Sequence, residues 1–107
     1  MIWAIITLQK EGFHSWIDAP DSVSFLRFKH RHIFYITVYL QQKHNERDVE
    51  YFLFKKWLTK NIHLINGSES CETIATRIKK RVEEHFNNSR QVKVQVMEDN
   101  ENGALVE

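Results

Sequence analysis

The sequence contains few cysteines, prolines and glycines, the residues that form cross-links or restrict or free the backbone. Among its 107 residues are one cysteine, one proline and three glycines. A single cysteine excludes a disulfide within the chain and a zinc site built from several cysteines of one chain. The chain also lacks a charge excess, because 15 basic and 14 acidic side chains leave a net charge of +1. Charge therefore gives no general attraction to nucleic acid or to anionic lipid.

Long apolar runs are missing as well. The two longest, residues 2–8 and 33–40, are far shorter than a membrane span, and threonine and tyrosine interrupt them. No basic segment or small-residue cleavage site follows Met1, so we expect no signal peptide. The length and an apolar fraction of 42% fit one globular domain over residues 1–107. We therefore expect a cytoplasmic protein without a membrane partner. Its one unusual feature is the presence of six histidines.

Four segments are predicted to be β-strands, two of them, residues 29–42 and 91–98, by alternation with a period of two and the first by its β-branched and aromatic residues. They cover residues 2–10, 29–42, 91–98 and, as a short last strand, 104–106. In the second segment the even positions are apolar along one face and carry His30 and His32 at one end. Both imidazoles are therefore expected to leave the same face of the sheet.

Two segments, residues 49–62 and 70–86, show the apolar spacing of an α-helix, and Ser70 is the expected N-cap of the second. Residues 63–69 between them are predicted to be a loop with a turn. Residues 12–27 form a connection between the first two strands, and its length favours a functional role. The order β-β-α-α-β-β predicts an α+β fold, in which two helices cover one face of a four-stranded antiparallel sheet.

Three histidines are the strongest candidates for a chemical site. On a strand, His30 and His32 lie about 7 Å apart at Cα, a spacing at which two imidazoles can share a metal ion. If the first two strands form an antiparallel pair, His14 at the end of the first strand meets them. Three imidazoles with a fourth position open are the ligand set of a catalytic zinc. The alternative is a structural subunit in which these are ordinary strand residues.

Further candidates lie at the start of the second helix and at the end of the third strand. The carboxylate of Glu98 either is solvated or accepts two N–H groups from a planar heterocycle. Ser70 and Cys71 offer the free backbone N–H groups of a helix start to a ligand, whereas Glu72 complements the helix dipole. We expect Cys71 to be a small buried residue rather than a reactive thiol. The bases and aromatics of residues 27–35 fall on both faces of their strand, which disfavours a nucleic-acid partner.

The order of these motifs along the chain carries a family resemblance. The motifs are His14, His30-Arg31-His32, the helix start over residues 70–75 and Val94-Gln95-Val96-Met97-Glu98, and they span nearly the whole chain. In this order they resemble the 6-pyruvoyl-tetrahydropterin synthase and 6-carboxy-tetrahydropterin synthase family. The resemblance implies the T-fold, whose subunits close into a barrel with sites at their interfaces. It implies a homo-oligomer, such as a hexamer, which the open edges of so small a sheet also favour.

The resemblance also implies a zinc ion and a heterocyclic ligand. Zinc would be bound by the three histidines, and Glu98 would anchor the ring of a dihydroneopterin triphosphate-like substrate in pterin or 7-deazapurine metabolism. The family's acidic residue at the helix start is kept as Glu72, which the resemblance adds to Ser70 and Cys71 as a substrate-binding residue. The chain departs from the family at Leu26, where the catalytic cysteine is expected, and at Arg31, which replaces the central glycine of the histidine pair.

Two functions from different classes follow from these matches and departures. The first is a zinc-dependent enzyme of the tetrahydropterin synthase type. Such an enzyme needs a proton-transfer group other than cysteine, and His63 is the loop histidine that we nominate. The second is a non-catalytic T-fold module that binds a purine, pterin or nucleotide at subunit interfaces. Leu26 in place of the thiol favours this second function.

Overall fold

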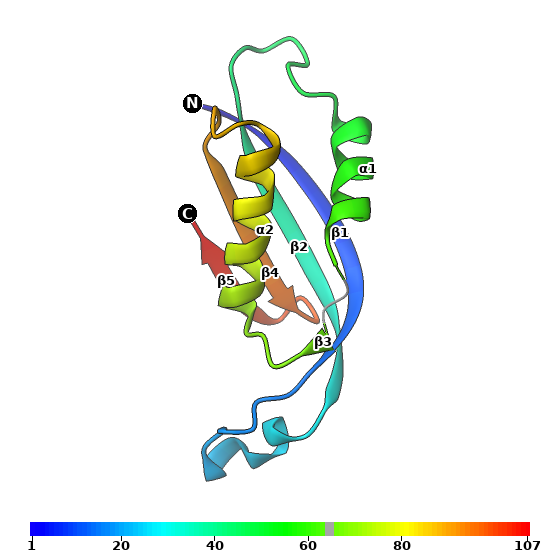
Figure 1. The fold of residues 1–107 in the computed structure, drawn as a ribbon, viewed down its shortest axis with the longest axis vertical. Coiled ribbons are helices and arrows are strands. Elements are labelled where there is room, and N and C mark those ends of the chain that lie inside the picture. The colour runs from blue at the N-terminus through cyan, green and yellow to red at the C-terminus, as the bar shows by residue number, and fades with distance from the viewer. Residues whose placement is uncertain (64–65) are drawn as a thin grey trace.

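One sheet forms the centre of the fold (Figure 1). The computed structural model describes residues 1–63 and 66–107 of the chain. Its strands pair in the order β3-β1-β2-β4-β5. Their bounds are Ile2–His14 for β1, His30–Gln42 for β2, Asn66–Gly67 for β3, Val92–Glu98 for β4 and Asn102–Val106 for β5. β1, β2, β4 and β5 are antiparallel neighbours, which confirms the predicted four-stranded antiparallel sheet.

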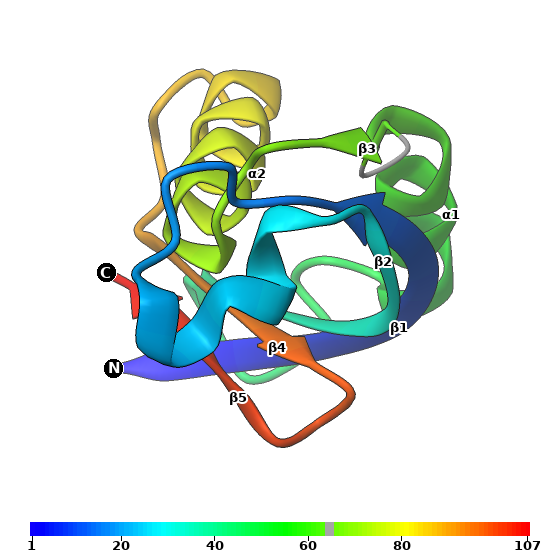
Figure 2. The ribbon, with the colours of Figure 1, turned by 90° about the horizontal axis from the view of Figure 1, so that it is seen from below.

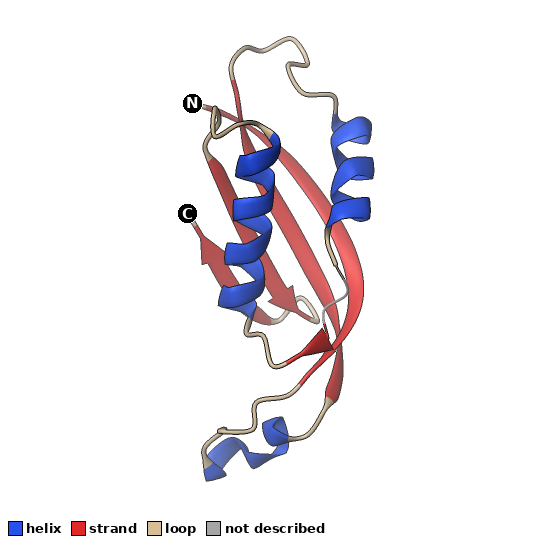
Figure 3. Ribbon diagram, viewed as in Figure 1, coloured by secondary structure: helices blue, strands red, loops and turns tan. Residues whose placement is uncertain are grey.

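Two α-helices cover one face of this sheet, as predicted (Figure 2, Figure 3). They are α1 (Tyr51–Asn61) and α2 (Cys71–His85). The side chain of Ser70 accepts a hydrogen bond from the Thr73 amide at 3.1 Å, so the predicted N-cap of α2 is confirmed. No helix in the described part of the chain has both the length and the apolar character needed to cross a membrane.

The β1–β2 hairpin is longer than predicted. β1 continues to His14 instead of ending near residue 10, because residues 11–14 pair with β2 as far as His30. Gly12 lies inside this ladder opposite His32, so here a glycine does not end a strand. The short strand β3 was not predicted either. An Asn-Gly pair is typical of a turn, but here it pairs in parallel with the end of β1.

Beyond the paired strands, the hairpin projects as an arm that we define as residues 15–29 (Figure 1). The predicted connection is thus partly helical, since the arm contains the 3-10 helix η1 (Asp21–Arg27). Arg27 fastens the arm by donating to the Ala19 carbonyl at 2.8 Å and to the Asp21 carboxylate at 2.6 Å.

The core lies between the sheet and the helices. The side chains of β2 that face the helices are fully buried, and they are Phe34, Ile36, Val38 and Leu40. They belong to one cluster with buried residues of both helices, among them Leu58, Ile74 and Val82. His30 and His32 continue the same face of β2 beyond this apolar run. The imidazoles therefore lie at the end of the core, where the sheet meets the arm.

Leu58 and Leu53 offer a matched test of this packing, because both are leucines of α1. Leu58 is 0% exposed and Leu53 is 69% exposed. We expect Leu58→Ala to lower the free energy of unfolding by about 2–5 kcal/mol, since it removes buried methyl groups and leaves a cavity. Leu53→Ala should change it by less than about 0.5 kcal/mol. Urea denaturation measures both, and equal losses would contradict the observed orientation of α1.

Candidate metal centre

Three histidines converge where the core meets the arm. The antiparallel register places His14 of β1 opposite His30 of β2, and His32 follows on the same face. One ring nitrogen from each residue lies within 4.8 Å of the other two. The predicted cluster is therefore confirmed as a group that could bind a metal ion.

Backbone carbonyls orient two of the imidazoles. His14 Nδ1 lies 3.1 Å from the carbonyl oxygen of Glu69, and His30 Nδ1 lies 2.7 Å from that of Phe28. A carbonyl oxygen can only accept a hydrogen bond, so each Nδ1 carries the hydrogen. In a neutral ring this leaves Nε2 with a lone pair that can bind a cation.

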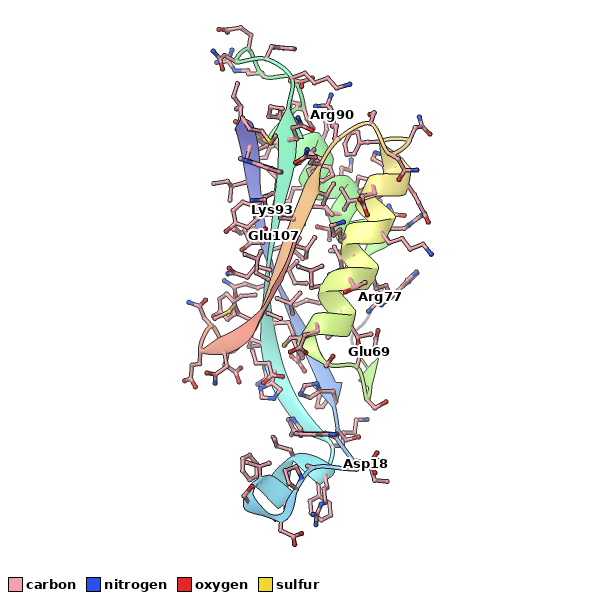
Figure 4. The ribbon with its side chains drawn as sticks, turned by 90° about the vertical axis from the view of Figure 1, so that its left-hand side faces the viewer. Asp18, Glu69, Arg77, Arg90, Lys93 and Glu107 are labelled. Carbon is pink, nitrogen blue, oxygen red and sulfur yellow. The ribbon has the colours of Figure 1, made fainter. Side chains whose placement is uncertain are left out.

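The segment that orients His14 is itself anchored to α2. Arg77 donates to both carboxylate oxygens of Glu69, at 3.0 and 3.1 Å. Figure 4 shows the two labelled residues near the start of α2. A bidentate pair of this kind adds geometric specificity as well as energy. The carbonyl that receives the His14 hydrogen is thus held by α2 as well as by the chain around it.

A carboxylate orients the third imidazole. His32 Nδ1 lies 2.6 Å from Oδ2 of Asp99, while Oδ1 of the same carboxylate accepts the Ile33 amide at 2.9 Å. The His32 contact, followed by the Ile33 amide, lowers the pKa of Asp99 below its ordinary value. Asp99 keeps its charge and fixes the Nδ1–H tautomer, as carboxylate partners of metal-binding histidines do.

The remaining ring nitrogens fit a metal ion. Nε2 of His30 and Nε2 of His32 are buried and have no hydrogen-bond partner among the described residues. Unpartnered buried polar atoms are uncommon and call for an explanation. A cation between the rings would satisfy both. Three neutral imidazoles are a donor set that suits zinc and other first-row transition metals.

Glu98 lies directly beside the cluster. Its Oε1 is 3.3 Å from His14 Nε2, and its Oε2 is 3.7 Å from His32 Nε2. The thiol of Cys71 donates to Oε1 at 3.6 Å. Burial, followed by the charge of Glu98, raises the pKa of Cys71 to about 12. Cys71 is therefore a buried hydrogen-bond donor, in agreement with the expectation of a small buried residue.

A cavity of about 640 Å³ adjoins the histidines. The predicted binding residues of the helix start, Ser70, Cys71 and Glu72, all line it together with Glu98. Leu26 of the arm lines it too, so the position at which the family has its cysteine does face the site. Among the described residues that line this cavity, none is lysine or arginine.

Two other residues discussed above lie elsewhere. His63 is exposed and lines a separate cavity of about 250 Å³ between α1 and α2, so the structure does not bring it to the histidines. Arg31 leaves the opposite face of β2 from its histidine neighbours and pairs with Glu11 at 3.2 Å. The residue that sequence reasoning missed is Asp99. The sequence feature that could have pointed to Asp99 is its position in the turn directly after Glu98.

No protein-family model matches the chain, and no curated protein matches it significantly. The family resemblance therefore stays a prediction that rests on the motifs.

Asp99 can be tested apart from the ligands that it orients. In Asp99→Asn one of the two acceptor oxygens becomes an NH2 group, so the side chain cannot accept from both His32 and Ile33. Asparagine tolerates the positive φ of 51° at this position. We expect a loss of zinc affinity of about 10- to 100-fold, measured by competition with a chelator. Glu101→Gln in the same turn is the control, and equal affinities in the two variants would contradict the role of Asp99.

Proposed function

We propose that this chain is a zinc-dependent T-fold protein similar to the 6-pyruvoyl- and 6-carboxy-tetrahydropterin synthases. The main support is the convergence of three imidazoles, each with Nδ1 bonded to an oxygen. Zinc is the metal that this donor set favours in an enzyme, because catalytic zinc sites commonly use three protein ligands. The cavity beside the cluster would give a small molecule access to the metal.

The substrate that we propose is a dihydroneopterin triphosphate-like compound. A volume of about 640 Å³ falls within the usual range of small-molecule sites. Zinc, when bound, would polarise an oxygen of the substrate side chain and make the adjacent C–H bonds more acidic. Glu98 on the cavity wall would accept N–H groups from the ring edge. The start of α2 at Ser70 and Cys71 would present backbone N–H groups to the ligand.

A specific observation favours the second candidate, a binding module without turnover. Leu26 lines the cavity where the family has a cysteine, and the thiol of Cys71 is engaged with Glu98. His63 lines the other cavity. Proton transfer requires a group within hydrogen-bond reach of the substrate, and none of these three residues provides one as placed. This module would hold a purine, pterin or nucleotide through the same metal and the same carboxylate.

We further propose that the working unit is a homo-oligomer with the cavity at a subunit interface. The described lining of the cavity has no lysine or arginine, so the phosphates of such a substrate would need cations from another copy. β5 at one edge of the sheet has unpaired backbone groups that can pair with a second chain. We expect a mass in solution of several times 12.9 kDa by light scattering, and the mass of one chain would contradict this assembly.

Metal content tests the proposed centre. We expect about one zinc per chain in purified wild-type protein, by elemental analysis. His30→Ala should lose most of this zinc, because it removes one of three imidazoles. His44→Ala is the control, since His44 is exposed in the segment after β2, where it contacts Asp48 and accepts from the Glu46 amide. Wild-type protein that binds no zinc, even when zinc is supplied, would overturn both candidate functions.

Incubation with dihydroneopterin triphosphate then separates the two candidates. The enzyme should convert it to a tetrahydropterin product that is absent with His30→Ala. The binding module should retain a heterocycle unchanged, and Glu98→Ala should release it, as seen by mass spectrometry. The same incubation with the dephosphorylated pterin tests whether the triphosphate is recognised at all.

A further inference from the structure

We propose that Glu98 is a fourth protein ligand of the metal, which closes the centre in the free protein and moves away when a heterocycle binds. Because it requires a metal ion on the three histidines, this role of Glu98 rests on the function proposed above. It differs from the role that the resemblance implies, in which Glu98 meets only the ring.

The positions of the imidazole hydrogens favour a metal ion between Glu98 and the histidines. Nδ1 of His14 donates to the carbonyl of Glu69, so Nε2 of the neutral ring has a lone pair and no hydrogen. Oε1 of Glu98 lies 3.3 Å from this nitrogen. Two acceptors at this distance repel each other unless a positive charge lies between them. The same holds for Oε2 of Glu98 and Nε2 of His32 at 3.7 Å, since the single N–H of the neutral His32 ring is Nδ1–H, which donates to Asp99.

The distance between Glu98 and His14 also fits a shared metal ion. Zinc binds imidazole nitrogen and carboxylate oxygen at about 2.0–2.2 Å, so adjacent ligand atoms of a tetrahedral site lie about 3.3–3.6 Å apart. The separation of 3.3 Å between Glu98 Oε1 and His14 Nε2 agrees with this value. Oε1 is also held from its other side by the Cys71 thiol, which donates at 3.6 Å. Oε1 of the carboxylate is thus at ligand distance from His14 and is positioned by a neighbour, whereas Oε2 lies just beyond that distance, at 3.7 Å from His32 Nε2.

The charge of Glu98 would further stabilise a divalent ion on the histidines. Three neutral imidazoles leave both charges of a divalent ion uncompensated in a largely buried site, which is costly. The carboxylate of Glu98 in contact with the cluster would offset one of them. Asp99 contacts Nδ1 of His32, on the other side of the ring from Nε2, so its charge acts on the site only through His32.

A consequence follows for ligand binding. The side chain of Glu98 is 27% exposed and lines the cavity, so it can be reached by a molecule that enters there. A carboxylate that accepts two N–H groups from a ring edge uses both of its oxygens. It cannot hold the ring in this way and also remain bound to the metal. Binding of the ring would therefore open a coordination position next to the substrate.

Cobalt(II) in place of zinc makes the coordination visible, because its absorption spectrum depends on the number of ligands. We expect wild-type protein with cobalt to show the spectrum of a four-coordinate site, unchanged by millimolar azide. Glu98→Gln should change the spectrum, bind azide and lose at least about tenfold in cobalt affinity. Glu101→Gln is the control, because Glu101 is an exposed carboxylate in the turn after β4 and is not among the residues that line the cavity. It should behave as wild type.

The outcomes separate this inference from the function on which it rests. Wild-type protein that takes up no cobalt and no zinc overturns the metal centre itself. Uptake with a wild-type spectrum that azide shifts shows an open position and overturns only the role of Glu98. This measurement needs no variant, so it decides the matter even if Glu98→Gln does not fold. Equal cobalt affinity and equal spectra for a folded Glu98→Gln and wild type would overturn it as well.

Discussion

The pairing of β1 with β2 is the constraint on which the site depends. Its register joins Ile2 to Gln42 at one end and His14 to His30 at the other. Side chains alternate between sheet faces, so a slip of one residue would send His30 and His32 away from His14. Residues outside the histidine cluster prevent this slip, because it would also expose the fully buried side chains between Phe34 and Leu40. Burial of the core thus fixes the geometry of the polar cluster.

Much of this fold was predictable because its signals are local. The alternation in β2 and the apolar spacing of α1 and α2 each report a face that must be buried. Ser70 as an N-cap depends only on the residues that follow it. The predictions were wrong where pairing overrode the local signal: Gly12 sits inside a strand, and Asn66-Gly67 forms β3 because the end of β1 lies alongside.

The site was predictable only in part, because only some of its contacts follow from local signals. His14, His30 and His32 could be placed together because strand period and antiparallel pairing suffice to do so. Asp99 contacts His32 across 67 residues of sequence, and no spacing rule connects them. His63 was nominated only because it is a histidine in a loop. Its position in the fold argues against that role, because it lines the cavity between the two helices.

The groups around the histidines are engaged in fixed hydrogen bonds, an arrangement that suits binding better than proton transfer. The three Nδ1–H groups donate to two carbonyls and to Asp99, and the Cys71 thiol donates to Glu98. Leu26 contributes only apolar surface at the position where the proposed resemblance predicts a thiol. Among the residues that the structure describes, Glu98 is the one charged side chain that both contacts the histidines and faces the cavity. A ligand that enters the cavity toward the histidines therefore meets this carboxylate, whether or not turnover follows.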